Sequence, residues 1–323
     1  MSVKKVIDCI RRNKTFLITS HQNLEGDALG SEISFYNLLR KSGKSAAIIN
    51  HDPVPREYTF LKGARLIKKY RHNMKIKADV LVLLDCSDKS RCGCVWNLAA
   101  PGQTIINIDH HISNTGFGDV SWVKPCASSV AEMIYQLYKA MNVRIDAETA
   151  KALYAGILTD TGSFRYPNTT ALTHQIAARL LKSKLDVAKI YRNIYESVSF
   201  SDMSLLSRIL LTLSKDATGK IIMFRIKKQL LEGKRVRIDL SENVLNFGRL
   251  IQDCEVCVLF KEQQGKTRQM RVNLRSKGLV DVNRIAQFFG GGGHKTASGC
   301  TISGSLQTVK RKVIRKIKEQ LQW

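Results

Sequence analysis

The first 180 or so residues alternate short apolar runs with amphipathic helical patterns, and this alternation limits the fold more than any other feature. Four apolar runs predict buried strands, at residues 16–20, 45–50, 78–85 and 103–109. Patterns with a spacing of three to four residues lie between and after these runs and predict helices. Strands that alternate with helices imply a parallel sheet with helices on both of its faces, so we predict an α/β fold.

The chain of 323 residues suits two domains. An almost wholly helical stretch with polar breaks follows the first alternating region, and beyond it short strand patterns resume. We therefore predict an N-terminal domain over residues 1–185, a helical linker over 186–213, and a smaller α/β domain over 214–323. The second domain ends with a strand, a helix, a run of four glycines and a basic closing helix.

The charge of the chain is strongly positive, because 52 Lys and Arg side chains face 27 Asp and Glu side chains, a net charge of +25. Such a charge favours polyanionic partners, with nucleic acid or nucleotides ahead of an acidic membrane surface. A basic but merely solvated surface is the alternative explanation. Charge therefore indicates a class of partner and says nothing about chemistry.

The eight cysteines are scattered through the chain, and no apolar run has the length needed to span a membrane. The N-terminal segment has an amphipathic helix pattern instead of the unbroken apolar core of a signal peptide. We expect reduced thiols and a cytoplasmic protein with no membrane partner.

Acids and histidines gather where the predicted strands end, and one further acid ends a helical pattern in "GILTDTGSF". Ligands of open parallel sheets bind beyond the carboxyl ends of the strands. A single polar residue at such a place is usually a turn former. Several together would repel one another unless cations lay between them. The residues in question are His21, Glu25, Asp27, Asp85, Asp109, His110, His111 and Asp160.

Mixed imidazole and carboxylate ligands suit Mn²⁺, Co²⁺, Zn²⁺ or Fe²⁺ better than Ca²⁺. The cluster offers more ligands than one open catalytic ion needs. It suits two ions roughly 3.5–4 Å apart that share a carboxylate, an arrangement found in phosphatases and nucleases. The sequence therefore predicts hydrolysis of a phosphate ester.

The second domain carries a predicted anion site. The alternation of a strand places Arg271, Asn273 and Arg275 on one face, where the arginines could hold a phosphate. Glycines in a row let the backbone turn its N–H groups towards an anion, and a histidine follows them. An ordinary exposed sheet face and a flexible loop are the alternatives. The residues expected to bind substrate are Arg271, Arg275, Gly291, Gly292, Gly293 and His294.

Five stretches of the sequence together resemble a known family. "HQNLEGDALGS", "LLDCS", "IDHHISN" and "GILTDTGSF" are similar, in this order, to the four motifs of the DHH phosphoesterase superfamily. "RVNLRSKGLVDVNRIAQFFGGGGHKTASG" resembles the DHHA1 domain that accompanies many members. The resemblance spans residues 16–299, and its length and plan are most similar to the nanoRNase (oligoribonuclease)/pAp phosphatase group. It implies a catalytic DHH domain, the helical linker, and a substrate-binding DHHA1 domain.

The resemblance implies a role for each clustered residue. His21, Glu25 and Asp85 would hold a first metal ion. A second ion would be held by Asp27, Asp85, His110 and Asp160, so that Asp85 bridges the pair. His111 would be the donor or acid beside the scissile phosphate, and Asp109 would orient a histidine. The cofactors implied are two divalent ions, Mn²⁺ first, with Co²⁺, Mg²⁺, Zn²⁺ and Fe²⁺ as alternatives.

The opening motif departs from the family pattern His-x-x-Pro-Asp-x-Asp-Ala, because Leu24 and Glu25 replace Pro and Asp. Glutamate keeps the charge and both oxygens, so it can ligate if the backbone withdraws by about one C–C bond, ~1.5 Å.

The activity implied is hydrolysis of short oligoribonucleotides to mononucleotides, together with pAp to AMP or cleavage of a linear dinucleotide. The partners implied are short single-stranded RNA or nucleotides. A homodimer of the chain is also compatible with the resemblance. Two alternatives are a non-catalytic nucleotide-binding protein, with Glu25 marking an altered site, and a broader single-strand exonuclease.

Overall fold

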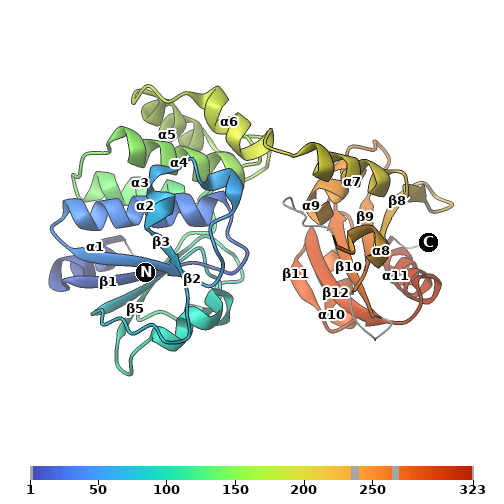
Figure 1. Ribbon diagram of the computed structural model, residues 1–323, viewed down its shortest axis with the longest axis horizontal. Coiled ribbons are helices and arrows are strands. Elements are labelled where there is room, and N and C mark those ends of the chain that lie inside the picture. The colour runs from blue at the N-terminus through green and yellow to red at the C-terminus, as the bar shows by residue number, and fades with distance from the viewer. Residues whose placement is uncertain (1–2, 234–239, 264–268, 322–323) are drawn as a thin grey trace. The chain divides into compact units, whose positions relative to one another are not determined.

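The computed structural model describes residues 3–233, 240–263 and 269–321 and forms two compact units, Met1–Ser197 and Val198–Trp323 (Figure 1). Helix α6 (Val187–Tyr195) belongs to the first unit and helix α7 (Phe200–Leu210) to the second. These two helices occupy most of the stretch for which the sequence predicts a helical linker.

The first unit is built on a parallel six-stranded sheet with the order β3-β2-β1-β4-β5-β6. This confirms the predicted parallel α/β fold. The four predicted strands are its four central ones, and the edge strands β3 and β6 are additional. The edge strands have three and four residues, too few to give a clear sequence pattern. The strand bounds are β1 (Thr15–Thr19), β2 (Ser45–Asn50), β3 (Ile67–Lys69), β4 (Val80–Leu84), β5 (Thr104–Asp109) and β6 (Val120–Val123).

The two faces of this sheet are covered differently, one by α-helices and the other by a 3₁₀ segment and loops. The first four α-helices pack on the face that carries Phe16, Ile18 and Val82 (Figure 1). The opposite face carries Leu17 and Leu81 and is covered by a 3₁₀ segment and by loops. The helices of the unit are α1 (Val3–Arg12), α2 (Gly26–Lys41), α3 (Val130–Ala140), α4 (Ala147–Asp160), α5 (Ala171–Leu181) and α6. Its 3₁₀ segments are η1 (Arg56–Tyr58), η2 (Lys62–Leu66) and η3 (Lys89–Leu98).

Two glycines let α2 and α4 approach each other closely. A Cβ atom on Gly30 of α2 would lie 2.4 Å from the carbonyl oxygen of Ala152 on α4. One on Gly156 of α4 would lie 2.7 Å from Cβ of Ala131 on α3 and 3.1 Å from Oδ1 of Asp27 on α2. Contacts that short exclude any side chain at either position without backbone movement. The close packing holds the start of α2 beside the end of α4, where two of the predicted ligands lie.

The second unit contains a mixed six-stranded sheet with the order β11-β12-β10-β9-β8-β7, in which only β8 and β9 run parallel. Helices α7 and α9 contribute to a core on one face, while α10 and α11 contribute to a core on the other. Its strands are β7 (Ser214–Lys215), β8 (Ile221–Ile226), β9 (Val256–Glu262), β10 (Gln269–Ser276), β11 (Gly292–His294) and β12 (Ala297–Ser303). Its helices are α7, α8 (Lys228–Leu231), α9 (Leu240–Arg249), α10 (Val282–Phe288) and α11 (Leu306–Leu321).

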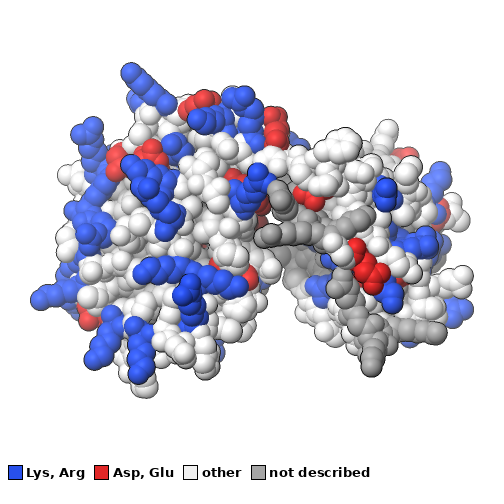
Figure 2. Space-filling model, in the orientation of Figure 1, with Lys and Arg blue, Asp and Glu red and all other residues white. Residues whose placement is uncertain are grey.

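Lys and Arg side chains are spread over the visible faces of both units, where they outnumber the acids (Figure 2). None of the helices within the described residues is both long and apolar enough to cross a membrane.

Candidate metal centre

Three neighbouring strands of the first sheet deliver predicted ligands to one edge. His21 comes two residues after β1, Asp85 directly follows β4, and His110 directly follows β5. Strands β4 and β5 pair Leu84 with Ile108, and the backbone N–H of Asp85 donates to the carbonyl of Ile108 at 3.0 Å. The parallel register therefore sets these ligand-bearing positions side by side at the carboxyl edge of the sheet.

A first group of possible ligands contains His21, Glu25 and Asp85. Nε2 of His21 lies 3.3 Å from Oδ2 of Asp85 and 3.7 Å from Oε1 of Glu25. Nδ1 of the same ring lies 2.7 Å from the carbonyl oxygen of Gln22, which accepts a hydrogen bond from Nδ1–H. In the neutral ring the lone pair is then on Nε2, which faces the carboxylates, as a metal ligand requires.

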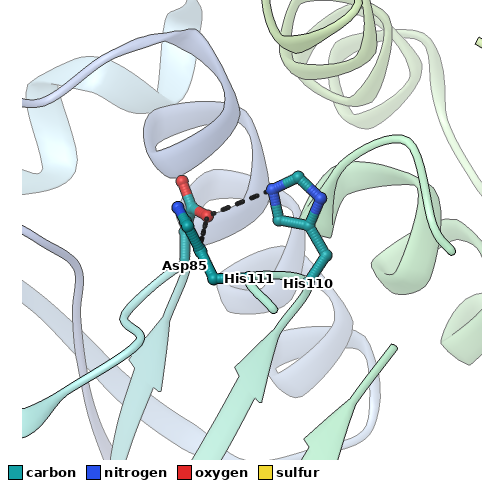
Figure 3. Close-up of side chains that lie close together, drawn as sticks. All are labelled: Asp85, His110 and His111. Carbon is teal, nitrogen blue, oxygen red and sulfur yellow. Dashed lines mark ion pairs between the residues drawn. The ribbon is translucent and has the colours of Figure 1, made fainter. Parts of the chain in front are cut away.

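A second group contains Asp27, His110 and Asp160, and a third contains Asp85, His110 and His111, so Asp85 and His110 join the three groups. Nε2 of His110 lies 3.4 Å from Oδ2 of Asp160 and 3.7 Å from Oδ1 of Asp85, towards which the ring points (Figure 3). Its Nδ1 lies 3.1 Å from the carbonyl oxygen of Ala127. Both histidines are therefore held from behind by a backbone carbonyl and turn Nε2 to the acids.

The carboxylate of Asp27 is fixed by the N-terminus of α3. Its Oδ2 accepts a hydrogen bond from the N–H of Val130 at 2.7 Å, and its Oδ1 accepts one from the N–H of Ala131 at 2.8 Å. The positive end of the helix dipole favours a carboxylate there. This anchor orients Asp27 without help from a metal ion.

His111 lies beside this cluster and is oriented by Asp109. Nδ1 of His111 is 2.7 Å from Oδ1 of Asp109 and 3.5 Å from Oδ1 of Asp85 (Figure 3). Asp109 is fully buried, and its Oδ2 accepts a hydrogen bond from Nδ2 of Asn114 at 2.6 Å. Asn114 is the last residue of the motif "IDHHISN", and its role beside Asp109 is evident only from the structure.

The buried acids raise the pKa of both inward-facing histidines. Burial lowers the pKa of His21, but the carboxylates of Asp85 and Glu25 outweigh it and raise that pKa to about 9. Burial also lowers the pKa of His110, and Asp160, Asp85 and Asp27 raise it to about 9. For Asp85 burial raises the pKa, yet the surrounding histidines bring it below its ordinary value.

The two remaining acids of the second group, Asp27 and Asp160, have raised pKa values, in contrast to Asp85. Burial, followed by the charge of Asp85, raises the pKa of Asp27 to about 7. Burial, followed by the charge of Asp27, raises the pKa of Asp160 well above its ordinary value. Without a cation the cluster therefore retains protons that separated carboxylates would lose at neutral pH.

The donor atoms at the centre fit a metal ion. Nε2 of His21, Oδ1 of Asp85 and Oδ2 of Asp160 are buried, and none has a hydrogen-bond partner among the described residues. A buried polar atom left unpaired costs about 1–3 kcal/mol, so three at one place indicate a bound partner such as a cation. Imidazole and carboxylate groups that converge in this way are suited to a divalent transition ion.

We predict that metal binding releases protons and strengthens with pH. At pH 7 the rings of His21 and His110, with pKa values of about 9, carry protons that an ion must displace. Apparent affinity for Mn²⁺ should rise about tenfold per pH unit, for each proton displaced, between about pH 6.5 and 8.5. Calorimetry in buffers of different ionisation enthalpy measures the released protons.

The exposed His72 provides the matched control, because its replacement by Gln should leave the proton release unchanged. A Mn²⁺ affinity independent of pH over the same range would contradict the assignment of these two rings as ligands.

Glu25 lies at the rim of the cluster, and its side chain does not cap helix α2. It is the residue that precedes α2, yet its side chain makes no capping hydrogen bond, and that side chain is 63 % exposed. The hydroxyl of Tyr58 lies near the N–H of Gly26, and this N–H lowers the pKa of the hydroxyl, although burial raises that pKa overall. No sequence signal connects Tyr58 with this helix, because η1 lies thirty residues further along the chain.

Asp85 occupies a left-handed backbone conformation, with φ of +57°. Residues other than glycine seldom adopt it, although Asp and Asn tolerate it best. Strain of this kind is concentrated at functional sites. At Asp85 it turns the chain sharply at the end of β4 and presents the carboxylate to both groups of ligands.

The predicted substrate residues of the second unit lie on and beside β10. Arg271 is exposed, and a Cβ atom on Gly299 of β12 would lie 2.7 Å from its Nη2. Gly299 is paired with Gly292 of β11, so the guanidinium lies over the strand next to the glycines. Arg275 forms an ion pair with Glu242, which occupies part of its guanidinium.

The glycine run at residues 290–293 offers an anion fewer backbone N–H donors than the sequence predicts. The N–H of Gly290 donates to the carbonyl of Gln287, and the N–H of Gly291 donates to the carbonyl of Ala286, so both close the end of α10. Gly292, Gly293 and His294 form strand β11, paired with β12. The predicted nest of N–H groups is therefore wrong for Gly290 and Gly291, because the helix end uses their donors.

Comparison with known families finds two matching domains. The model of the DHH family, N-terminal domain, matches residues 15–157, and the model of the DHHA1 domain matches residues 218–322. The two matches lie in the first and the second unit, respectively.

Bacterial proteins similar to this chain match it over most of its length. The chain is 31% identical over 306 residues to the bifunctional oligoribonuclease and PAP phosphatase NrnA of Thermus thermophilus, covering 94% of this chain and 89% of that protein. It is 29% identical over 302 residues to the protein of that name from Bacillus subtilis, covering 92% of each. Among solved structures, an exopolyphosphatase-related protein of Bacteroides fragilis has a TM-score of 0.90 at 25% identity, covering 98% of this chain and 95% of that chain.

Proposed function

Because this chain belongs to the DHH family and carries a DHHA1 domain as well, we propose that it is a metal-dependent phosphoesterase of short oligoribonucleotides. We propose that it releases mononucleotides from these RNAs and converts pAp to AMP, as the names of its relatives indicate for those proteins. The observation that carries the proposal is the set of buried, unpaired donor atoms of His21, Asp85 and Asp160.

The proposed ligand sets draw on these groups: the first group forms one set, Asp85 is added to the second group to form the other, and His111 is kept for proton transfer. His21, Glu25 and Asp85 would hold one divalent ion, and Asp27, Asp85, His110 and Asp160 a second, with Mn²⁺ as the preferred metal. A bound pair of ions would make a nucleophile from water at neutral pH and neutralise charge on the phosphate. The task of the chain is to hold these six side chains in place, and the backbone contacts of His21, His110 and Asp27 support that.

We assign proton transfer to His111. Its Nδ1 is held by Asp109, so Nε2 is the nitrogen through which it would give a proton to the leaving oxygen. Asp109 stabilises the protonated ring and fixes its orientation, and Asn114 in turn holds Asp109. The pKa of His111 is raised, because Asp109 and Asp85 together outweigh the effect of burial, which suits a general acid at neutral pH.

The second unit would bind the end of the substrate remote from the cut. Arg271 is the most suitable anion ligand there, because it is exposed and lies beside β11. We propose Gly292, Gly293 and His294 as the neighbouring contacts, whereas Arg275 already pairs with Glu242.

The test uses RNAs of two to five nucleotides, pAp, and a long single-stranded DNA in parallel, each with purified protein and Mn²⁺. We expect mononucleotides from the short RNAs, AMP from pAp, and little degradation of the long strand. Equal degradation of long DNA would favour the broader exonuclease. Absence of turnover with Mn²⁺, Co²⁺ and Mg²⁺ would refute the proposal.

The non-catalytic alternative depends on Glu25, and the substitution Glu25→Asp tests it. Glu25 is mostly exposed at the rim and the substitution keeps a carboxylate, so it should change the metal preference and alter kcat/KM by less than about tenfold, below the roughly 10–100-fold loss typical when a partner of a metal ligand is removed. Activity assays with Mn²⁺, Co²⁺ and Mg²⁺ measure this. An inert wild-type protein that becomes active only as Glu25→Asp would show that the natural site is impaired.

A further inference from the structure

Three tyrosines of the first unit are well exposed, whereas aromatic rings are normally buried. Tyr166, Tyr191 and Tyr195 are 38%, 40% and 39% exposed. The last two lie one turn apart on α6, with ring centroids 4.8 Å apart at 47°. Large exposed aromatic groups that lie together commonly mark a binding surface.

A strained loop positions the first of these rings. Gly162, Ser163 and Phe164 have successive positive φ angles of 55°, 62° and 63°, two of them at residues with a side chain. The ring of Phe164 is held by stacking on His174, with centroids 5.3 Å apart. The turn lays the ring of Tyr166 against Gly162, where an added Cβ would meet it at 2.4 Å. Strain of this kind persists where the surrounding structure enforces it, often at functional sites.

Two segments of the chain connect the tyrosines with the metal centre. The strained loop begins two residues after the ligand Asp160, and its Ser163 side chain lies close enough to the hydroxyl of Tyr195 to affect the pKa of that hydroxyl. Helix α6 also packs on η1, whose Tyr58 lies near both Tyr195 and Glu25. The rings are thus tied to both Asp160 and the loop that carries Glu25, at the proposed cutting site.

We propose that Tyr166, Tyr191 and Tyr195 form a stacking surface for nucleobases beside the metal centre. This inference rests on the proposed function and names the part of the substrate that the first unit recognises. Every base has a flat π-face, so tyrosine rings bind single-stranded RNA with little sequence preference. Arg165 is exposed next to Tyr166, and its Nε–H donates to the carbonyl of Gly162 at 2.7 Å, which keeps a positive charge at this surface.

The stacking surface gives the catalytic unit a means of selecting its substrate. A metal centre alone would act on any accessible phosphate ester, because it contacts only phosphate and water. Rings beside it add binding energy solely for esters that carry a base. The surface therefore favours nucleotides over base-free phosphates, independently of any contact made by the second unit.

The test compares diadenylate with the same dinucleotide lacking one base, using Tyr166→Ala and Tyr191→Ala. Each variant should raise KM for intact diadenylate about thirtyfold, the middle of the range for loss of one base-aromatic contact, with a much smaller change in kcat. KM for the substrate that lacks the stacked base should not change. The Phe variants at both positions should recover most of the affinity, because they keep the ring.

Leu172→Ala is the matched control, since Leu172 is 40% exposed in the same unit but has no aromatic ring. Mn²⁺ binding and thermal unfolding of each variant report whether the fold is intact. Equal KM values for intact and base-free substrates in the wild type, or Ala variants with an unchanged KM for diadenylate, would overturn the stacking surface while leaving the phosphoesterase standing. A wild type without turnover would instead refute the proposed function itself.

Discussion

Asp85→Asn is expected to reduce kcat/KM by about a thousandfold or more and to weaken metal binding at both groups of ligands. Asp85 is the one carboxylate that faces His21 on one side and His110 on the other, at 3.3 and 3.7 Å. Loss of several kcal/mol of charge stabilisation by the metal pair corresponds to this factor. The substitution keeps size and tolerates the left-handed backbone, so the measured loss reports the charge.

Titration of the histidine rings gives a second readout of the same variant. Asp85 is one of the charges that raise the pKa of His21 and His110, so both values should fall in the metal-free Asn variant. NMR titration of the ring protons measures this without any turnover. Asp8→Asn, a partly exposed acid on α1, is the matched control. An Asn variant with two bound ions and full activity would contradict the bridging role.

His111→Ala is expected to lower kcat by about 10²–10⁴-fold while leaving metal binding nearly intact. The ring is paired with Asp109 through Nδ1, and the proposed ligand sets do not include it. Its contribution is proton donation to the leaving group, so a nucleotide ester of p-nitrophenol, which needs no proton to depart, should lose much less. Parallel kinetics with diadenylate and with this ester measure the difference.

Asp109→Asn should fall between the wild type and His111→Ala, because it disturbs the orientation and charge of the ring without removing it. His72→Ala, far from the cluster in sequence and exposed, is the control for a histidine without a role. Equal losses for diadenylate and the nitrophenyl ester would contradict proton transfer by His111 and favour a part in substrate binding.

The sequence could predict the centre because its ligands follow strands with simple patterns. A buried run that ends in Asp85 or in Asp109 marks a strand end, and parallel strands bring their ends together. The resemblance to the family then supplied distinct roles for residues that chemistry alone could only group. Comparison with relatives confirms the family, whereas the role of each residue stays a prediction.

The features that the sequence could not show depend on contacts between distant segments. Tyr58 lies near the first turn of α2 although about thirty residues separate them, and neither segment carries a local signal for this contact. Close packing at Gly30 and Gly156 brings the second set of ligands together, yet an isolated glycine within a helix pattern ordinarily indicates a weak point. Gly290 and Gly291 illustrate the opposite error, because a glycine run suited to an anion also suits a helix end.

Glu25 and Asp85 have different backbone conformations, and this difference determines which side chains each position tolerates. Glu25 has an extended backbone, with φ of −127° and ψ of −176°, and reaches the cluster from an exposed rim, so a longer acid there meets no barrier. Asp85 is buried with φ of +57°, a conformation that suits Asp and Asn and penalises most other side chains. Acids of different length are therefore tolerated at Glu25, on the rim of the centre, whereas the backbone at Asp85 restricts that position to Asp or Asn.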